Sequence, residues 1–360
     1  MLTRPHPRDT AQETFAFDDD VRGAPGVDVD AGGAGRRRPL RAIAISYLVT
    51  VFVLVTLNFL LPRALPGDPI LSLIDPAAPT RVPIEELRQE LEAFYGLDRP
   101  LLVQYVDYLG DLARGDLGVS IRYNRPVAEL IGERLPWTLL LIVAAMGFAT
   151  IVGWVAGVHS AWRRGRPVDM GLLTVFLTLR SFPTFFLGSI ALFVLGVQLD
   201  LFPLAGARST SELMGPLARA VDIAHHLALP ALIMALPFVG GHYHLMRASI
   251  VTELGADYLV AGRAKGLGER RLKYGYAARN ALLPVVTLTA LHLSAAVTTE
   301  AIVVETVFGY PGLGRLLVDA VPFRDYPTLQ ASFLILAFVV VTANLLADLL
   351  YAALDPRTRR

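Results

Sequence analysis

The run LPWTLLLIVAAMGFATIVGWVAGVHSAW, residues 135–162, contains no Asp, Glu, Lys or Arg. A helix needs about 20 mostly apolar residues to cross the hydrocarbon core of a bilayer, so this run is long enough to span a membrane. Inside hydrocarbon every backbone N–H and C=O must be hydrogen-bonded within the segment, which makes a helix its expected form. The run therefore predicts an integral membrane protein, with Trp137–Trp162 as the membrane part of this segment.

Five further stretches of similar length and low charge lie elsewhere in the 360-residue chain. Together the six blocks predict an all-α membrane protein with six transmembrane helices, and they make a soluble protein with buried core helices a weak alternative. The first block is too long for the core of a signal peptide, which is about 7–15 residues, and a long tail precedes it. The expected spans are 42–61, 137–162, 170–199, one between Asp222 and Arg247, one between Arg279 and Glu300, and 328–354.

The overall composition agrees with this fold class. Hydrophobic residues make up 54% of the chain and charged residues 18%, against roughly 45–50% and about 25% in ordinary soluble domains. The net charge of +1 gives no reason to expect a nucleic acid as partner. The sequence has no cysteine, which excludes disulfides, thiolate metal sites, iron–sulfur clusters and a cysteine nucleophile.

The distribution of basic residues predicts the orientation. Twenty of the 33 basic residues fall in the tail to Arg41, the loop 163–166, the region 247–279 and the last residues 357–360, which six spans would place on one side. The opposite segments carry 12, eight of them in the long segment after the first span. Basic residues accumulate on the cytoplasmic side of membrane proteins, so both termini are predicted to be cytoplasmic.

The segments divide into a tail, an external part and a membrane core. Residues 1–35 are rich in Asp, Gly and Pro and lack periodicity, which is typical of a disordered cytoplasmic tail. Transmembrane helix 1 is expected within 36–61, an external domain over 62–136, and the other five helices over 137–357.

The external domain is expected to contain two short helices, at 84–94 and 100–113. Pro83 precedes the first, and Gly96 follows it, as proline and glycine commonly do at helix ends. Capping the membrane path, contacting an external protein and lying as a helix pair on the lipid surface remain open roles for this domain.

The predicted cytoplasmic loop 247–284 is too long for a tight turn. It contains a helical stretch, about 256–265, that ends at Gly266-Leu267-Gly268. A short helix of this kind suits docking in a groove of a soluble partner. The positive-inside rule alone would account for the basic residues of the loop, but not for its apolar residues or its glycines.

The same loop carries the most specific pattern in the chain. Residues 257–267 read DYLVAGRAKGL, and residues 278–287 read ARNALLPVVT. These motifs resemble the cytoplasmic coupling motif of the membrane subunits of bacterial ABC importers, and most of all the dipeptide, oligopeptide and nickel permease family. The resemblance covers about 41–357. Further segments that agree are LPGDP (65–69), GLDRP (96–100), GDLGVS (115–120), SFPTFFLG (181–188), VETVFGYPGLG (304–314) and 348–357.

The resemblance implies the type I permease fold of ABC importers and a division of labour among subunits. An extracytoplasmic solute-binding protein would deliver the solute, and two permeases would form the path as a heterodimer in the bacterial inner membrane. This chain looks like the first of the two. Two cytoplasmic ATPases would drive the cycle, and neither Lys265 nor Lys273 follows a glycine, so the chain has no phosphate-binding Gly-x-x-x-x-Gly-Lys run of its own. We therefore expect no enzyme, no catalytic residue and no cofactor.

The resemblance also implies a set of coupling residues in the loop. Gly262 stands where the peptide subfamily more often has alanine, and because alanine is the better helix former, a looser docking helix is expected. The coupling residues are Asp257, Tyr258, Ala261, Arg263, Ala264, Lys265, Gly266, Leu267, Leu283 and Pro284.

A second set is expected along the translocation path and centres on Arg180, a charge where the family usually has none. An ionisable group inside a span is costly and is treated as functional by default, and a guanidinium suits a carboxylate. One hypothesis is that Arg180 contacts the C-terminal carboxylate of a peptide in transit. The alternative is that it pairs with Glu300 or Asp348, or snorkels. The path residues are Arg180, Pro183, Phe185, Asn344 and Asp348, with an interhelical hydrogen bond or the membrane boundary as the alternative for the last two.

The remaining motifs point to no metal site and to no other class of function. His242 and His244 are two apart and point in different directions on a helix, His225-His226 is no better, and His292 is best explained by packing. A secondary transporter would show paired broken helices around an ion site, whereas here only the third block is plainly interrupted, near Pro183. A Gly-x-Ser-x-Gly hydrolase motif is absent. Dipeptides, longer peptides, nickel chelates and other small solutes stay open as cargo, because similar subunits carry each of them.

Overall fold

The structure is a computed structural model that describes residues 40–64, 83, 86, 89, 99–209 and 215–354, all within the compact unit 39–360. The predicted tail 1–35 and nearly all of the first external helix, 84–94, lie outside these residues. Across the described residues the chain is helical, and its only β pairing is an isolated bridge between Val119 and Pro126. The all-α class is confirmed.

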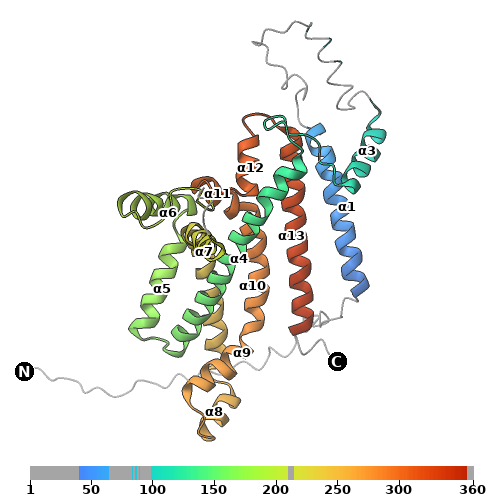
Figure 1. The fold of residues 1–360 in the computed structure, drawn as a ribbon. Coiled ribbons are helices and arrows are strands. Elements are labelled where there is room, and N and C mark those ends of the chain that lie inside the picture. The colour runs from blue at the N-terminus through green and yellow to red at the C-terminus, as the bar shows by residue number, and fades with distance from the viewer. Residues whose placement is uncertain are drawn as a thin grey trace, which may run out of the picture. The chain divides into compact units, whose positions relative to one another are not determined.

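Proline begins several of the helices that Figure 1 shows. Pro167 and Pro216 open their helices, where a missing N–H costs nothing and the fixed φ suits the first turn. The elements are α1 (Leu40–Ala64), α3 (Leu101–Arg114), α4 (Val127–Trp162), α5 (Pro167–Arg180), α6 (Thr184–Ala191), η2 (Leu192–Gln198), α7 (Pro216–Glu253), α8 (Asp257–Ala264), η3 (Arg271–Ala277), α9 (Ala278–Asn280), α10 (Leu282–Ala295), η4 (Ala296–Glu300), α11 (Ala301–Val307), α12 (Leu313–Ala320) and α13 (Tyr326–Leu354).

Four described segments are long and apolar enough to cross a bilayer: Val127–Trp162, Pro216–Glu253, Pro284–Val307 and Tyr326–Leu346. α5 with its continuation to Gln198 adds a fifth if the pair forms one span, and α1 contributes a shorter apolar helix, Ala44–Leu60. These segments overlap all six predicted blocks, and the count of six spans stays a prediction.

Two boundaries differ from the predicted ones. α4 begins at Val127, well ahead of Trp137, and keeps Pro136 inside the helix. The fifth segment lies nearer the C-terminus than predicted, because η3 and α9 take up residues 271–280 as part of the preceding loop.

The predicted third span is broken rather than continuous. α5 ends at Arg180, and the helix that restarts at Thr184 makes an angle of 98° with it. Pro183 has no N–H to continue the helical ladder and restricts the residue before it. The interruption that Pro183 predicts is thus present, but it is a sharp change of direction, and Arg180 lies at the bend rather than within a straight span.

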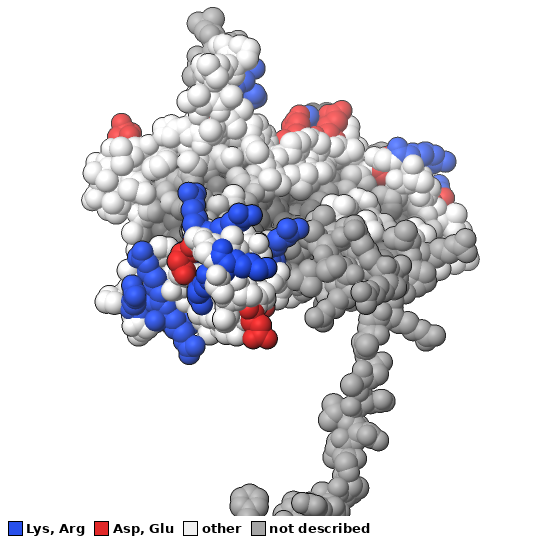
Figure 2. Space-filling view, turned by 90° about the horizontal axis from the view of Figure 1, so that it is seen from below, with Lys and Arg blue, Asp and Glu red and all other residues white. Residues whose placement is uncertain are grey.

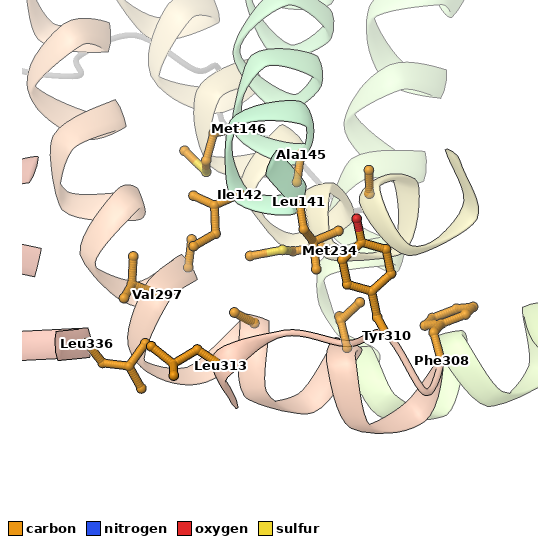
Figure 3. Close-up of a cluster of buried hydrophobic side chains, with 14 of the residues drawn as sticks. Leu141, Ile142, Ala145, Met146, Met234, Val297, Phe308, Tyr310, Leu313 and Leu336 are labelled. Atoms are coloured by element: carbon orange, nitrogen blue, oxygen red, sulfur yellow. The ribbon is translucent and has the colours of Figure 1, made fainter. Parts of the chain in front are cut away.

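The core of the unit lies between α4 and α7 and is closed by side chains from η4 and the C-terminal helices (Figure 3). Leu141, Ile142 and Met234 are among its fully buried residues. α4 and α7 approach closely because α4 presents glycines: a Cβ on Gly153 would lie 2.5 Å from the Cβ of His242. Close packing through small residues is a main source of helix association where lipid is as apolar as the helices.

The segments predicted to be cytoplasmic lie at one end of the unit (Figure 1). The start of α1, the connection 163–166, α8 and the end of α13 are all found there, whereas α3 and α12 lie toward the other end. Figure 2 views this end, where basic side chains gather around the loop. The exposed ones are Arg163, Arg164, Arg166, Arg263, Lys265, Arg270, Arg271 and Arg279.

Candidate functional site

The loop helix predicted at 256–265 is present as α8, Asp257–Ala264. It ends because Gly266 adopts a left-handed conformation, with φ of 74°. The N–H of Leu267 then donates to the carbonyl of Gly262 at 3.1 Å, and the N–H of Gly266 donates to that of Arg263 at 2.9 Å. This closes the free carbonyls at the helix end, so the glycine stop read from the sequence is confirmed.

The inner face of α8 packs tightly against η3. Leu259 and Leu272 are fully buried, and Gly262 is buried between them. A Cβ on Gly262 would lie 2.6 Å from Cδ2 of Leu272. A looser helix at Gly262 stays a prediction, and the structure adds that the missing methyl group lets Leu272 pack directly on the helix backbone.

The outer face of α8 is exposed and carries most of the predicted coupling residues. Asp257, Ala261, Arg263, Ala264, Lys265 and Gly266 are all exposed. Val260 adds an apolar side chain that is 58% exposed. α8 is the outermost helix at its end of the unit (Figure 1). The face therefore combines apolar and basic groups on a helix supported from behind.

Tyr258 joins α8 to the end of α7. Its hydroxyl donates a hydrogen bond to a carboxylate oxygen of Glu253. Burial, together with this hydrogen bond, raises the pKa of Tyr258 above its usual value. The hydroxyl therefore keeps its proton and its role as donor throughout the physiological range.

Glu269 ties the tip of the loop to the end of α4. The indole Nε1 of Trp162 donates to its carboxylate at 2.8 Å, and Nε of Arg263 lies 3.4 Å from the other oxygen. An exposed pair of this kind contributes little to stability, but it fixes the direction of the Arg263 side chain.

An ion pair that the sequence did not indicate holds α5 against α7 at the same end. Nε and Nη2 of Arg247 each donate to a carboxylate oxygen of Asp169 at 2.7 Å. Asp169 is 1% exposed and also accepts hydrogen bonds from Ser160 and the N–H of Gly165. The two residues are 78 positions apart, so only their places next to membrane helices could have drawn attention to them.

A second buried carboxylate, that of Glu305 in the VETVFGYPGLG motif, lies at the N-terminus of α12. Glu305 is fully buried and accepts hydrogen bonds from Thr138 at 2.6 Å and from the N–H of Arg315 at 3.0 Å. It thereby closes the N-terminus of α12, where a negative charge is favoured. A Cβ on Gly312 would lie 2.1 Å from this carboxylate, so the glycine makes room for the acid.

Arg180 lies at the bend between α5 and α6 and is exposed. Its side chain lies near Gly240 of α7, where an added Cβ would be 3.8 Å from both Cβ and Cδ of Arg180. Among the described residues, no carboxylate forms a salt bridge with it. Glu300, one of the two predicted partners, instead hydrogen-bonds Thr184, and the Asp348 side chain lies outside the described residues.

The other predicted path residues lie at the start of α6 and on α13. Pro183 caps α6, and Phe185, on the first turn of that helix, is 57% exposed. Asn344 accepts a hydrogen bond from Ser294 of α10 at 3.0 Å, which is the interhelical alternative given for it. Pro284 is exposed at the start of the fifth segment, and the side chain of Leu283 lies outside the described residues.

The histidines serve packing and hydrogen bonding within the bundle. Nδ1 of His242 lies 2.9 Å from the carbonyl of Phe238, and Nε2 lies 2.9 Å from the hydroxyl of Thr289. The ring of His292 lies 4.8 Å from that of His242, edge to face. Among the residues that the structure describes, no group of three His, Asp or Glu residues could hold a metal ion.

Known proteins are similar to this chain over most of its length. Residues 149–360 match the family described as "Binding-protein-dependent transport system inner membrane component". The chain belongs to this family of transport permeases. It is 39% identical over 323 residues to the oligopeptide transport system permease protein AppB of Bacillus subtilis, covering 89% of this chain and 97% of that protein. It is also 38% identical over 315 residues to the glutathione transport system permease protein GsiC of Escherichia coli K12, covering 88% and 96%.

Membership of the permease family confirms the resemblance read from the coupling motifs. It makes the chain a multi-pass protein of the inner membrane and a component of an ABC transport system that works with a binding protein, a partner permease and an ATPase. A transport permease is not an enzyme class, in agreement with the expectation. The bend at Arg180 and the outer face of α8 lie within the matched region.

Proposed function

We propose that this permease is the first of the two membrane subunits of an ATP-driven importer of dipeptides or oligopeptides. An external binding protein delivers the peptide, this chain and a second permease enclose the path, and two cytoplasmic ATPases supply the energy. Two relatives named for oligopeptide and glutathione transport, which match nearly their full length, support a peptide as cargo.

The observation that carries the proposal is the construction of α8. Its outer face is exposed, while its inner face is locked to the bundle by Leu259, Leu272 and the Tyr258–Glu253 hydrogen bond. A helix that presents one apolar and basic face on a rigid base suits insertion into a groove on a soluble partner. It also transmits force, because movement of α8 must move α7 and α4 with it.

The connection from α8 to the path runs through packed elements. Leu259 and Leu272 belong to a buried cluster with Val158 of α4 and with Met246 and Ile250 of α7. The Asp169–Arg247 pair then joins α7 to α5, whose other end is the bend at Arg180. Docked ATPases that close on ATP would thus shift a connected set of helices between two arrangements.

The proposed role of Arg180 is to meet the negatively charged end of the peptide. It is exposed at a break in a span, and its guanidinium has no carboxylate partner among the residues described. A guanidinium binds a carboxylate through two parallel hydrogen bonds. Pro183 and Phe185 are proposed to line the path next to it.

The experiment that tests the proposal is reconstitution. The chain, a second permease, the ATPases and the binding protein are purified together and placed in vesicles, and uptake of a labelled dipeptide is measured. We expect ATP-dependent uptake that stops when any one component is left out. Uptake by this chain alone would make it a secondary transporter, and uptake of a nickel chelate without peptide would reassign the cargo.

A further inference from the structure

A buried lysine lies where η3 packs beneath the end of α4. Lys273 is 8% exposed, and its Nζ lies 3.1 Å from Nδ1 of His159 and 4.9 Å from the ring centre of Tyr274. Among the described residues, none of the ion pairs involves this lysine. A buried cation without a counter-charge is costly. The arrangement therefore calls for an anion from outside this part of the chain.

The contacts of Lys273 bring no negative charge: Nδ1 of His159 accepts from its ammonium group, and Tyr274 offers the face of its ring. The ring of His159 lies in the field of both Lys273 and Arg163, which follows α4. The Trp154 ring of α4 lies 5.9 Å from the ring of Tyr274, which in turn lies beside the lysine. An anion with several acceptor oxygens, such as a phosphate, matches this set.

The exposed face of α4 above these groups is apolar. Ile151 and Val155 are 64% and 41% exposed. Residues four apart lie on the same face of a helix, and the next step of four reaches His159. The stripe therefore leads directly into the basic groups, as acyl chains lead into a headgroup. Trp and Tyr are also enriched at this depth of a membrane.

We infer that the end of α4 and η3 form a binding site for an anionic phospholipid. Lys273 and Arg163 bind its phosphate, and Ile151 and Val155 contact an acyl chain. The inference rests on the proposed orientation, which puts this end at the cytoplasmic leaflet, where basic pockets between membrane helices hold anionic headgroups. Because Leu272, next to Lys273, packs on Gly262 of α8, a bound lipid would brace the coupling loop from behind.

The test measures lipid binding to the delipidated, assembled transporter by native mass spectrometry. Phosphatidylglycerol and phosphatidylcholine are titrated separately. We expect one phosphatidylglycerol to bind at least fivefold more tightly than phosphatidylcholine, and Lys273→Gln to remove that preference, since one cation near the membrane surface accounts for about a fivefold change. Lys273→Arg should keep the preference. Arg164→Gln removes an exposed charge from the same end and serves as the matched control, with no change expected.

Three outcomes would overturn the inference. One is equal binding of the two lipids, as when the second permease covers the site. Another is the same preference in Lys273→Gln as in Arg164→Gln. The third is displacement of the lipid by an equal concentration of inorganic phosphate, which would make the site one for free phosphate. If Lys273→Gln does not assemble, Arg163→Gln decides, because it removes the exposed cation of the site and leaves the buried lysine in place; an unchanged preference would refute the site. Binding is measured without transport, so a failure of peptide uptake would refute the proposed function and leave this result standing.

Discussion

Gly312 and Glu305 show how one buried carboxylate fixes the identity of a neighbouring residue. A Cβ on Gly312 would lie 2.1 Å from the carboxylate carbon of Glu305. We expect Gly312→Ala to lower the free energy of unfolding by about 1–3 kcal/mol, because the methyl group must push the acid away from the N-terminus of α12. The measurement is the thermal midpoint of the purified protein in detergent.

The control for this change is Gly171→Ala on α5, where the new Cβ meets no atom within 4 Å. Alanine is the better helix former, so Gly171→Ala should leave the midpoint unchanged or raise it slightly. Equal midpoints for the two variants would show that the Glu305 carboxylate has room to move.

Arg180 permits a test of cargo recognition by a single side chain. If its guanidinium binds the peptide carboxylate, Arg180→Leu should reduce uptake of free peptides roughly tenfold or more, as expected for the loss of a charge-assisted hydrogen-bond pair. Uptake of peptides with an amidated C-terminus should change much less. Arg180→Lys should fall between, since an ammonium keeps the charge without the fork. Unchanged selectivity between free and amidated peptides in both variants would assign Arg180 to packing or to snorkelling.

At the scale of elements, the extent of a helix was predictable where consecutive residues determine it. The bilayer requires a long apolar run, so the blocks around α4, α7 and α13 were visible without any contact information. The stop of α8 was visible too, because Gly266 provides a left-handed conformation that other residues rarely adopt. These features depend on a few consecutive residues.

Features that depend on distant residues were not predictable. Pro183 predicted an interruption but not the 98° angle between α5 and α6, since both helices pack against elements far away in the sequence, α5 against α7 and α6 against α7 and α11. The Asp169–Arg247 pair joins residues 78 positions apart. The packing at Gly262 was not predictable for the same reason: helix propensity considers the helix alone, whereas Leu272 of η3 occupies the place of the missing methyl group.

The proposed docking of the ATPase on α8 predicts variants that insert in the membrane but lose ATP-driven uptake. Lys265→Glu reverses an exposed charge, and Gly266→Trp places a large side chain at a left-handed position beside the outer face. We expect both proteins to insert normally but to lose most ATP-driven uptake, because the ATPase no longer seats on the helix. The measurement pairs uptake with co-purification of the ATPase. Arg164→Gln is the control, and full uptake with normal co-purification in both variants would contradict the assignment.

At the scale of the whole molecule, the predicted orientation can be tested because the native chain has no cysteine. Gly215 and Gly255 lie at the two ends of α7 and are both exposed. A Cβ added at either position would have no atom within 4 Å, so Gly215→Cys and Gly255→Cys form a matched pair of variants. The excess of basic residues near Gly255 predicts that this end is cytoplasmic. A membrane-impermeant maleimide should therefore label Gly215→Cys in intact cells and Gly255→Cys only after permeabilisation. The reverse pattern would invert the topology and with it the docking face of α8, and labelling of both in intact cells would show that α7 does not cross the membrane.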